Sequence, residues 1–146
     1  MELTPVLEKF ILHWGEMGTR WGVNRTVAQI HALLFASPQP LTADELAKTL
    51  SVARSNVSIS LRELQTWGLV RVVHVMGDRK DHYEAIKDVW EMLHIILEER
   101  KTREIDPTLT VLRECVVEAE QDPQVDESTS ERIAEMLEYF EEMTTW

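Results

Sequence analysis

Residues 41–86 have the sequence LTADELAKTLSVARSNVSISLRELQTWGLVRVVHVMGDRKDHYEAI, and this stretch decides the fold class. Thr42 and Glu45 form a capping box, and Leu41 and Leu46 are placed as the hydrophobic staple around it. This pattern predicts a short helix at the start of the stretch.

A second helix and a hairpin follow in the same stretch. We expect Ser51 to cap this helix and Gly68 to end it, since glycine is favoured just past a helix end. Residues 69–75 are rich in β-branched side chains and predict a strand. Residues 82–85 return as its partner after a turn at Gly77, and we expect residue 75 to pair with His82, with His74 and His82 on opposite faces. A two-stranded hairpin is marginally stable alone. It must therefore pack on the helices before it.

Residues 1–40 predict two helices before this stretch. Thr4 is placed to cap the first, with Pro5 at its first helical position. Gly22 ends that helix and Asn24 caps the next.

Three more helices are predicted after the hairpin from their apolar periodicity. The first is long and ends at Asp106–Pro107, and the second ends at Asp122–Pro123. A capping box at Ser128–Glu131 predicts the start of the last helix.

These elements predict a mainly α fold. The fold is a winged helix-turn-helix with a two-stranded β-wing, flanked by N- and C-terminal dimerisation helices. We predict three regions: an N-terminal dimerisation helix over 1–22, a DNA-binding domain over 23–86 and a C-terminal helical dimerisation region over 87–146.

The helix after Ser51 has a face suited to the major groove. Around Val57, a helical wheel predicts a buried face made by Ala53, Ser60, Leu61 and Leu64. The opposite face carries short polar side chains, one arginine and one isoleucine: Ser55, Ile59, Arg62 and Thr66, flanked by Asn56 and Ser58. Arginine can pair with guanine, asparagine with adenine, and isoleucine can contact a thymine methyl.

The charge distribution is uneven. The chain has a net charge of −11, and residues 87–146 carry six bases and seventeen acids. Residues 46–62 contain three bases and no acid. A helix start without a carboxylate, with Arg54 beside it, suits a phosphate group. The alternative is an ordinary solvent-facing helix that happens to be low in acid.

The tip of the hairpin carries two adjacent bases, Arg79 and Lys80. An arginine on a thin loop can enter a narrow minor groove, where the potential is most negative. Asp78 and Asp81 would offset part of this charge. The alternative is a plain polar turn.

At these residues the chain resembles the GbsR/MarR family of winged-helix transcriptional regulators. The matching stretches are Trp21–Gly22, Asn24–Thr26, Gln29–Leu34, Ser37–Pro38, Leu41–Ala47, Arg54–Ser58, Leu61–Leu64, Trp67–Val70 and Gly77–Glu84. The resemblance implies a homodimer that binds a pseudo-palindromic operator in double-stranded DNA. It implies that the recognition helix acts through Arg54, Ser55, Asn56, Ser58 and Arg62, and the wing through Arg79 and Lys80. The helical wheel adds Ile59 to the predicted DNA-binding residues. It also implies a repressor released by a small ligand, such as a choline-like osmoprotectant.

Exposed apolar helix faces support the dimer. The first helix carries an apolar seam at spacings of three and four: Leu7, Phe10, Trp14, Met17 and Trp21. A stripe of this size is unusual on a monomer, so a twofold dimer is expected. Three tryptophans, Trp14, Trp21 and Trp90, are candidate ligand-binding residues, because aromatic rings can hold a quaternary ammonium group through cation–π attraction. Ordinary core packing is the favoured alternative for all three.

Other functional classes find no support in the sequence. The five histidines and Cys115 lack metal-ligand spacing, so we expect no metal or other cofactor. No nucleophile with a nearby base is recognisable, so we expect no enzyme. No apolar run is long enough to span a membrane, and one cysteine points to the reducing cytoplasm. The rival function is a winged-helix protein-interaction module that uses its acidic helices and does not bind DNA.

Overall fold

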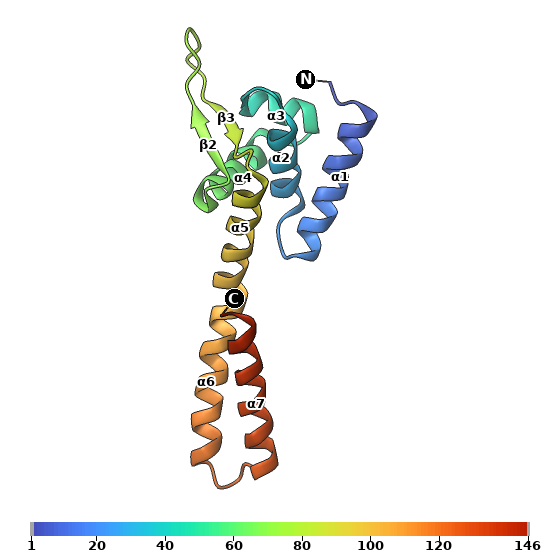
Figure 1. Ribbon diagram of the computed structural model, residues 1–146. Helices are drawn as coiled ribbons and strands as arrows, with labels where there is room; N and C mark the ends of the chain where they lie inside the picture. Colours follow the sequence, from blue (N-terminus) through green and yellow to red (C-terminus); the bar gives the residue numbers. More distant parts are fainter. Residues whose placement is uncertain (1, 146) are drawn as a thin grey trace. The chain divides into compact units, whose positions relative to one another are not determined.

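The computed structural model describes residues 2–145, which fall into two compact units that meet between Ile95 and Ile96. The elements of the first unit are α1 (Pro5–Arg20), α2 (Arg25–Ala36), β1 (Leu41–Thr42), α3 (Ala43–Leu50), α4 (Arg54–Trp67), β2 (Val70–Val73) and β3 (His82–Ala85) (Figure 1). Helix α5 (Val89–Arg100) begins in the first unit and ends in the second. The second unit continues with a π-helical turn (Lys101–Ile105), α6 (Asp106–Gln121) and α7 (Glu127–Met143). Mainly helical structure with a small wing confirms the predicted fold class.

Helix α2 is the centre of the first unit. Most of its side chains are buried, so it is apolar nearly all round rather than amphipathic. Its buried residues are Val27, Ala28, Ile30, His31, Ala32, Leu33 and Leu34. Helices α1 and α4 both pack on it. The helix-turn-helix is thereby fixed to a rigid support.

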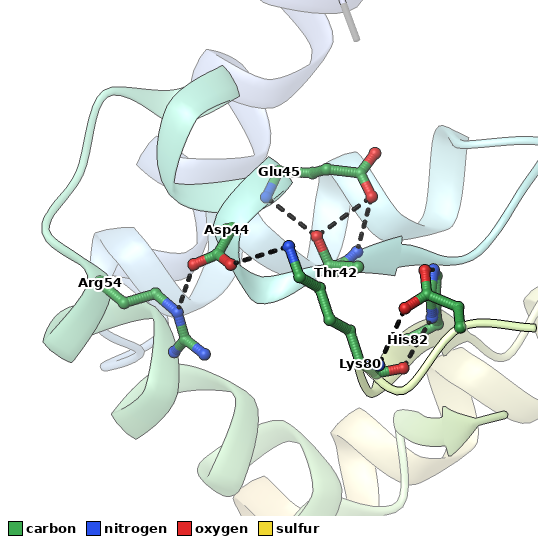
Figure 2. Close-up of polar contacts among 7 residues, drawn as sticks. Thr42, Asp44, Glu45, Arg54, Lys80 and His82 are labelled. Carbon is green, nitrogen blue, oxygen red and sulfur yellow. Dashed lines mark hydrogen bonds and ion pairs between the residues drawn. The ribbon is translucent and has the colours of Figure 1, made fainter. Parts of the chain in front are cut away.

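Three of the predicted helix starts are confirmed. The Thr4 hydroxyl accepts a hydrogen bond from the Leu7 amide at the start of α1. The Asn24 side chain accepts one from the Thr26 amide at the start of α2. At the start of α3 both halves of the capping box form, and Figure 2 shows the hydrogen bonds between Thr42 and Glu45.

The predicted start of the helix after α3 was wrong. Ser51 does not cap α4 but is the last cap of α3, in the left-handed region with a φ of 55°. Helix α4 begins at Arg54, and Ala53 precedes it with no side-chain hydrogen bond. Ala53 is therefore exposed and lies outside the buried face predicted for it. The sharp turn between the helices uses Ser51 to reverse the chain, so it is not free to act as an N-cap.

The sheet has three strands in the order β1-β3-β2, not two. Strand β1 ends on Thr42, the first residue of the capping box, and pairs through Leu41 with Tyr83. In the hairpin Val73, not residue 75, pairs with His82. A shift of two residues keeps every side chain on its predicted face, so His82 is buried while His74 is exposed. The longer loop that results carries the wing tip beyond the strands (Figure 1).

Two predicted boundaries in the last third were also wrong. The chain does not break at Asp106–Pro107 but passes through a π-helical turn into α6, with the proline in its first turn. A wider turn accommodates the missing N–H and the bulk of Pro107 without ending the helix. Helix α7 begins before the predicted capping box, because Asp126 accepts the hydrogen bond from the Ser128 amide first. The break at Asp122–Pro123 is confirmed.

Helix α1 packs on α2 along a face that includes Gly15 and Gly18. Ile11 and Gly15 are buried at this contact, and the side chains of the predicted seam lie beside it. Of the seam, Leu7, Trp14 and Met17 are half-buried, whereas Phe10 and Trp21 are exposed. A Cβ atom added at Gly18 would lie 2.6 Å from the Cβ of Ala28. Close approach of the two helices therefore depends on glycine at this position.

Gly18→Ala is expected to destabilise the first unit by about 1 kcal/mol. Overpacking costs roughly 1–3 kcal/mol, and the gain in helix propensity returns about 1 kcal/mol. Urea unfolding followed by tryptophan fluorescence measures the difference. Gly68→Ala cannot serve as the control for this substitution, because the positive φ of Gly68 disfavours alanine even where there is space for its side chain. An unchanged or raised unfolding free energy for Gly18→Ala would contradict the packing described.

Among residues 2–145, no helix is long and apolar enough to cross a membrane.

Candidate nucleic-acid interface

Helix α4 presents the polar face that the sequence predicted. Val57, Ser60, Leu61 and Leu64 are buried against the core. The opposite face is exposed and consists of Ser55, Asn56, Ile59, Arg62 and Thr66. Ser58 lies at the edge of this face and is half-buried. Ile59 keeps 60% of its surface exposed, although it is a large apolar side chain without a core position.

The N-terminus of α4 lacks the usual neutralising groups. Its first turn has no acidic residue, and no side chain caps it. The amide groups at such an end, together with the helix dipole, attract anions. Arg54 occupies the first position of the helix and adds its own positive charge.

Arg54 is held by two neighbours. Its Nε donates to Oδ1 of Asp44 at 2.9 Å, and its Nη1 donates to the Ser58 hydroxyl. Asp44 lies in the first turn of α3. The guanidinium is thus oriented by groups from both helices of the helix-turn-helix.

The wing residues are exposed at the tip of the hairpin. The Lys80 amide donates to Oδ1 of Asp78 at 2.9 Å, and Oδ2 of Asp78 lies 3.6 Å from Nε2 of His82. The Nδ1 atom of His82 contacts the Lys80 carbonyl. Asp78 therefore shapes the loop around Lys80, and it does not contact Arg79 in any described interaction. Arg79 is exposed to solvent.

Asp44 joins the two predicted binding elements, as Figure 2 shows. One carboxylate oxygen contacts Arg54 of α4, and the other lies 3.6 Å from Nζ of Lys80 in the wing. The hydrogen bond from Arg54 is the main cause that lowers the pKa of Asp44, and the charges of Arg54 and Lys80 add to it. Asp44 is therefore an anion at neutral pH. It is a carboxylate that contacts one predicted binding residue in each of the two elements.

Sequence reasoning missed Asp44. It lies just before the acid-free stretch, and its place in the first turn of α3 explains it fully as a helix-dipole partner. Its two cationic neighbours are ten and thirty-six residues away along the chain. Only the turn at Ser51 and the return of the wing bring the three together.

The three candidate tryptophans do not share one site. Trp14 lines a cavity of about 120 Å³ in the first unit, together with Phe10, His31, Ala32, Phe35, Val89 and Met92. Trp21 and Trp90 are not among these lining residues. Trp90 is 84% exposed.

His31 is the buried polar group of this cavity. Its Nδ1 accepts a hydrogen bond from Nε1 of Trp14 at 3.2 Å, and its Nε2 has no hydrogen-bond partner. Burial lowers the pKa of His31 to about 4, and the positive charge of Lys87 contributes. Lys87 donates from Nζ to three carbonyls at the end of α2, those of Leu34, Phe35 and Ser37. His31 is therefore neutral at physiological pH.

The second unit contains an antiparallel pair of helices with apolar residues left on its surface. Helices α6 and α7 pack together, and Arg113 bridges to Glu141 across them. The large apolar side chains that remain exposed are Val111, Val117, Met136, Tyr139 and Met143. Surface of this kind is available for a partner.

Comparison with known proteins points to one class. Residues 21–81 match the model of the MarR family. The match runs from the end of α1 to the wing. YvaV of Bacillus subtilis (strain 168), whose name describes an HTH-type transcriptional regulator, is 20% identical over 140 residues. That alignment covers 92% of this chain and 79% of YvaV.

Solved structures share the fold. A crystal structure described as that of a transcriptional regulator aligns with a TM-score of 0.68 at 18% identity, and covers 95% of this chain and 90% of that chain. The ST1889 protein of Sulfolobus tokodaii aligns with a TM-score of 0.50 at 22% identity. It covers 66% of this chain and 92% of its own.

Proposed function

We infer that this chain, whose residues 21–81 match the MarR family, is a MarR-family transcriptional regulator that binds double-stranded DNA. In this proposal α4 lies in the major groove and the wing reaches the adjacent minor groove. The residues proposed to contact DNA are Arg54, Ser55, Asn56, Ser58, Ile59 and Arg62 of α4, and Arg79 and Lys80 of the wing. The family is one of regulators, so no catalytic role is proposed.

The observation that supports DNA contact most strongly is the exposed face of α4. It is free of carboxylates in a chain of net charge −11, and its uncapped end lies beside Arg54. Phosphate contacts supply most of the affinity for DNA, and they depend on local rather than total charge because salt screens charges beyond about 10 Å. The net negative charge of the whole chain therefore does not by itself exclude binding through α4.

Selection of bound duplexes from a random pool, followed by gel shifts at several salt concentrations, tests this proposal. A DNA-binding regulator enriches one sequence and loses affinity steeply as salt rises. The rival protein-interaction module would enrich none and would bind no duplex at low salt. Either result separates the two functions.

Lys80→Ala is expected to weaken binding to the enriched operator and to random duplex by similar factors. A wing lysine acts through phosphates, which carry no sequence information. The slope of log affinity against log salt should fall by about one. Arg132→Ala, which removes a positive charge from α7, should leave the slope unchanged. A loss confined to the operator would contradict a phosphate role for Lys80.

We propose further that the protein acts as a homodimer on a pseudo-palindromic operator. The exposed apolar residues of α1, α6 and α7 support this, because a monomer rarely exposes so many. A twofold axis would place two α4 helices about 34 Å apart, one turn of DNA. Sedimentation at micromolar concentration should give a mass of two chains, and a single-chain mass would count against the dimer.

A repressor controlled by a small effector in the cytoplasm is the remaining part of the proposal. The cavity beside Trp14 supports it, since aromatic side chains on its wall can hold a cationic group. Choline is the first compound to titrate against Trp14→Leu and the unchanged protein. Wild-type fluorescence, melting temperature and operator affinity that all stay constant would remove choline as the effector.

A further inference from the structure

Asp44 is an anionic group that contacts both cationic elements of the proposed DNA-binding surface. Its two oxygens divide their contacts, with Oδ1 at 2.9 Å from Nε of Arg54 and Oδ2 at 3.6 Å from Nζ of Lys80 (Figure 2). The contacts link three separate segments, namely the first turn of α3, the first residue of α4 and the wing tip.

All three side chains are open to solvent. Asp44 is 61% exposed, Arg54 54% and Lys80 64%. Ion pairs at such exposure contribute little to folding stability. The arrangement therefore has little value for the fold, but it lies where a phosphate would approach.

A carboxylate at this position has two opposing effects on DNA binding. Its negative charge repels phosphate and uses one donor each of Arg54 and Lys80, which weakens binding to every duplex. Its hydrogen bond with Arg54 and its ion pair with Lys80 also favour one orientation of the two side chains, which removes part of the ordering cost when a matching site binds. Random duplex experiences only the repulsion, whereas a matching site also benefits from the pre-oriented side chains.

We propose that Asp44 is a specificity-determining residue of this regulator, a positioning group that suppresses binding to random DNA by bridging Arg54 and Lys80. The inference rests on the proposed function, because it assumes that α4 and the wing contact DNA. When a matching duplex lets α4 enter the major groove fully, Arg54 approaches the DNA in the orientation already set by Asp44. A random duplex, held through its phosphates alone, does not reach this docked geometry and is opposed by the carboxylate.

Asp44→Asn tests the proposal, because asparagine keeps the shape and removes the charge. Binding to random duplex should tighten about three- to fivefold at 0.1 M salt. Binding to the operator enriched by the wild type should change by less than about twofold, since the lost orientation offsets the gained attraction. The ratio of operator to random affinity should therefore fall about threefold.

Asp81→Asn is the matched control. Asp81 is an exposed wing carboxylate next to Lys80 in sequence, and it has no described contact with Arg54. Its loss should tighten both affinities by one common factor and leave the ratio unchanged. If Asp44→Asn also changes both affinities by a common factor, or weakens random binding, the proposal is overturned.

A double-mutant cycle with Arg54→Gln separates positioning from simple charge removal. If Asp44 acts through Arg54, the effect of Asp44→Asn on the affinity ratio should be smaller in the Arg54→Gln background than in the wild type. Equal effects in both backgrounds would overturn a role through Arg54. Wild-type protein that binds no duplex at all would refute the proposed function itself, and the inference would fall with it. Circular dichroism melts of each variant confirm that the fold is retained.

Discussion

Arg62→Ala is expected to weaken binding to the operator by about 1–3 kcal/mol, roughly a five- to 150-fold loss, and to reduce random binding far less. Arg62 lies at the middle of the exposed α4 face, one turn beyond Ile59. A bidentate arginine–guanine pair carries sequence information, whereas phosphate contacts do not. The operator should also tolerate more base changes at the position that Arg62 contacts.

The measurement is a pair of titrations on operator and random duplex at one salt concentration. Arg62→Lys keeps the charge but lacks the planar fork, so it should restore random binding fully and operator binding only in part. Arg132→Ala on α7 controls for the change in net charge. Equal losses on both duplexes for Arg62→Ala would assign Arg62 to the phosphate backbone and refute a base contact.

The positions of Arg62 and Lys80 show how much of the candidate site could be predicted from the sequence. The helical period around Val57 was enough to place Arg62 on the exposed face, because the buried side of a helix follows directly from its apolar positions. The turn at Gly77 was enough to place Lys80 at the hairpin tip. Both expectations concern local structure, and both placements agree with the structure.

Errors occurred where neighbouring signals compete. Ser51 is a good N-cap by type, but the chain needs a left-handed residue there to reverse its direction. Helix α7 begins directly after Asp126 and not at the capping box predicted at Ser128, because the Asp126 side chain already accepts a hydrogen bond from the Ser128 amide. A two-residue strand such as Leu41–Thr42 has too few residues to show alternation. None of these outcomes can be decided from local propensity alone.

Contacts between distant segments were beyond the sequence altogether. Asp44 and Lys80 are thirty-six residues apart, and no periodicity relates them. Close packing of Gly18 on Ala28 depends on the path of the loop between α1 and α2. The contacts of Asp44 therefore required the three-dimensional structure, whereas the exposed polar face of α4 could be predicted from the sequence.

Acid should destabilise the first unit through His31. Burial lowers the pKa of His31 from 6.5 to about 4, so the unfolded chain binds a proton between these pH values while the folded chain does not. Stability from this group is fully present above pH 6.5 and falls as the pH drops toward 4. From pH 7 to pH 5 the loss is about 2 kcal/mol, and it approaches about 3 kcal/mol below pH 4.

His31→Gln isolates this effect from the carboxylates, which titrate in an overlapping range. The amide oxygen of glutamine can accept the hydrogen bond from Nε1 of Trp14 but does not titrate. Urea unfolding at pH 7 and pH 5 should show a fall in unfolding free energy that is about 2 kcal/mol smaller in the variant than in the wild type. Equal falls would mean that His31 accepts its proton equally well in the folded and the unfolded chain. The buried Nε2 atom has no hydrogen-bond partner, so a positive charge there would be poorly compensated, and we therefore expect the falls to differ.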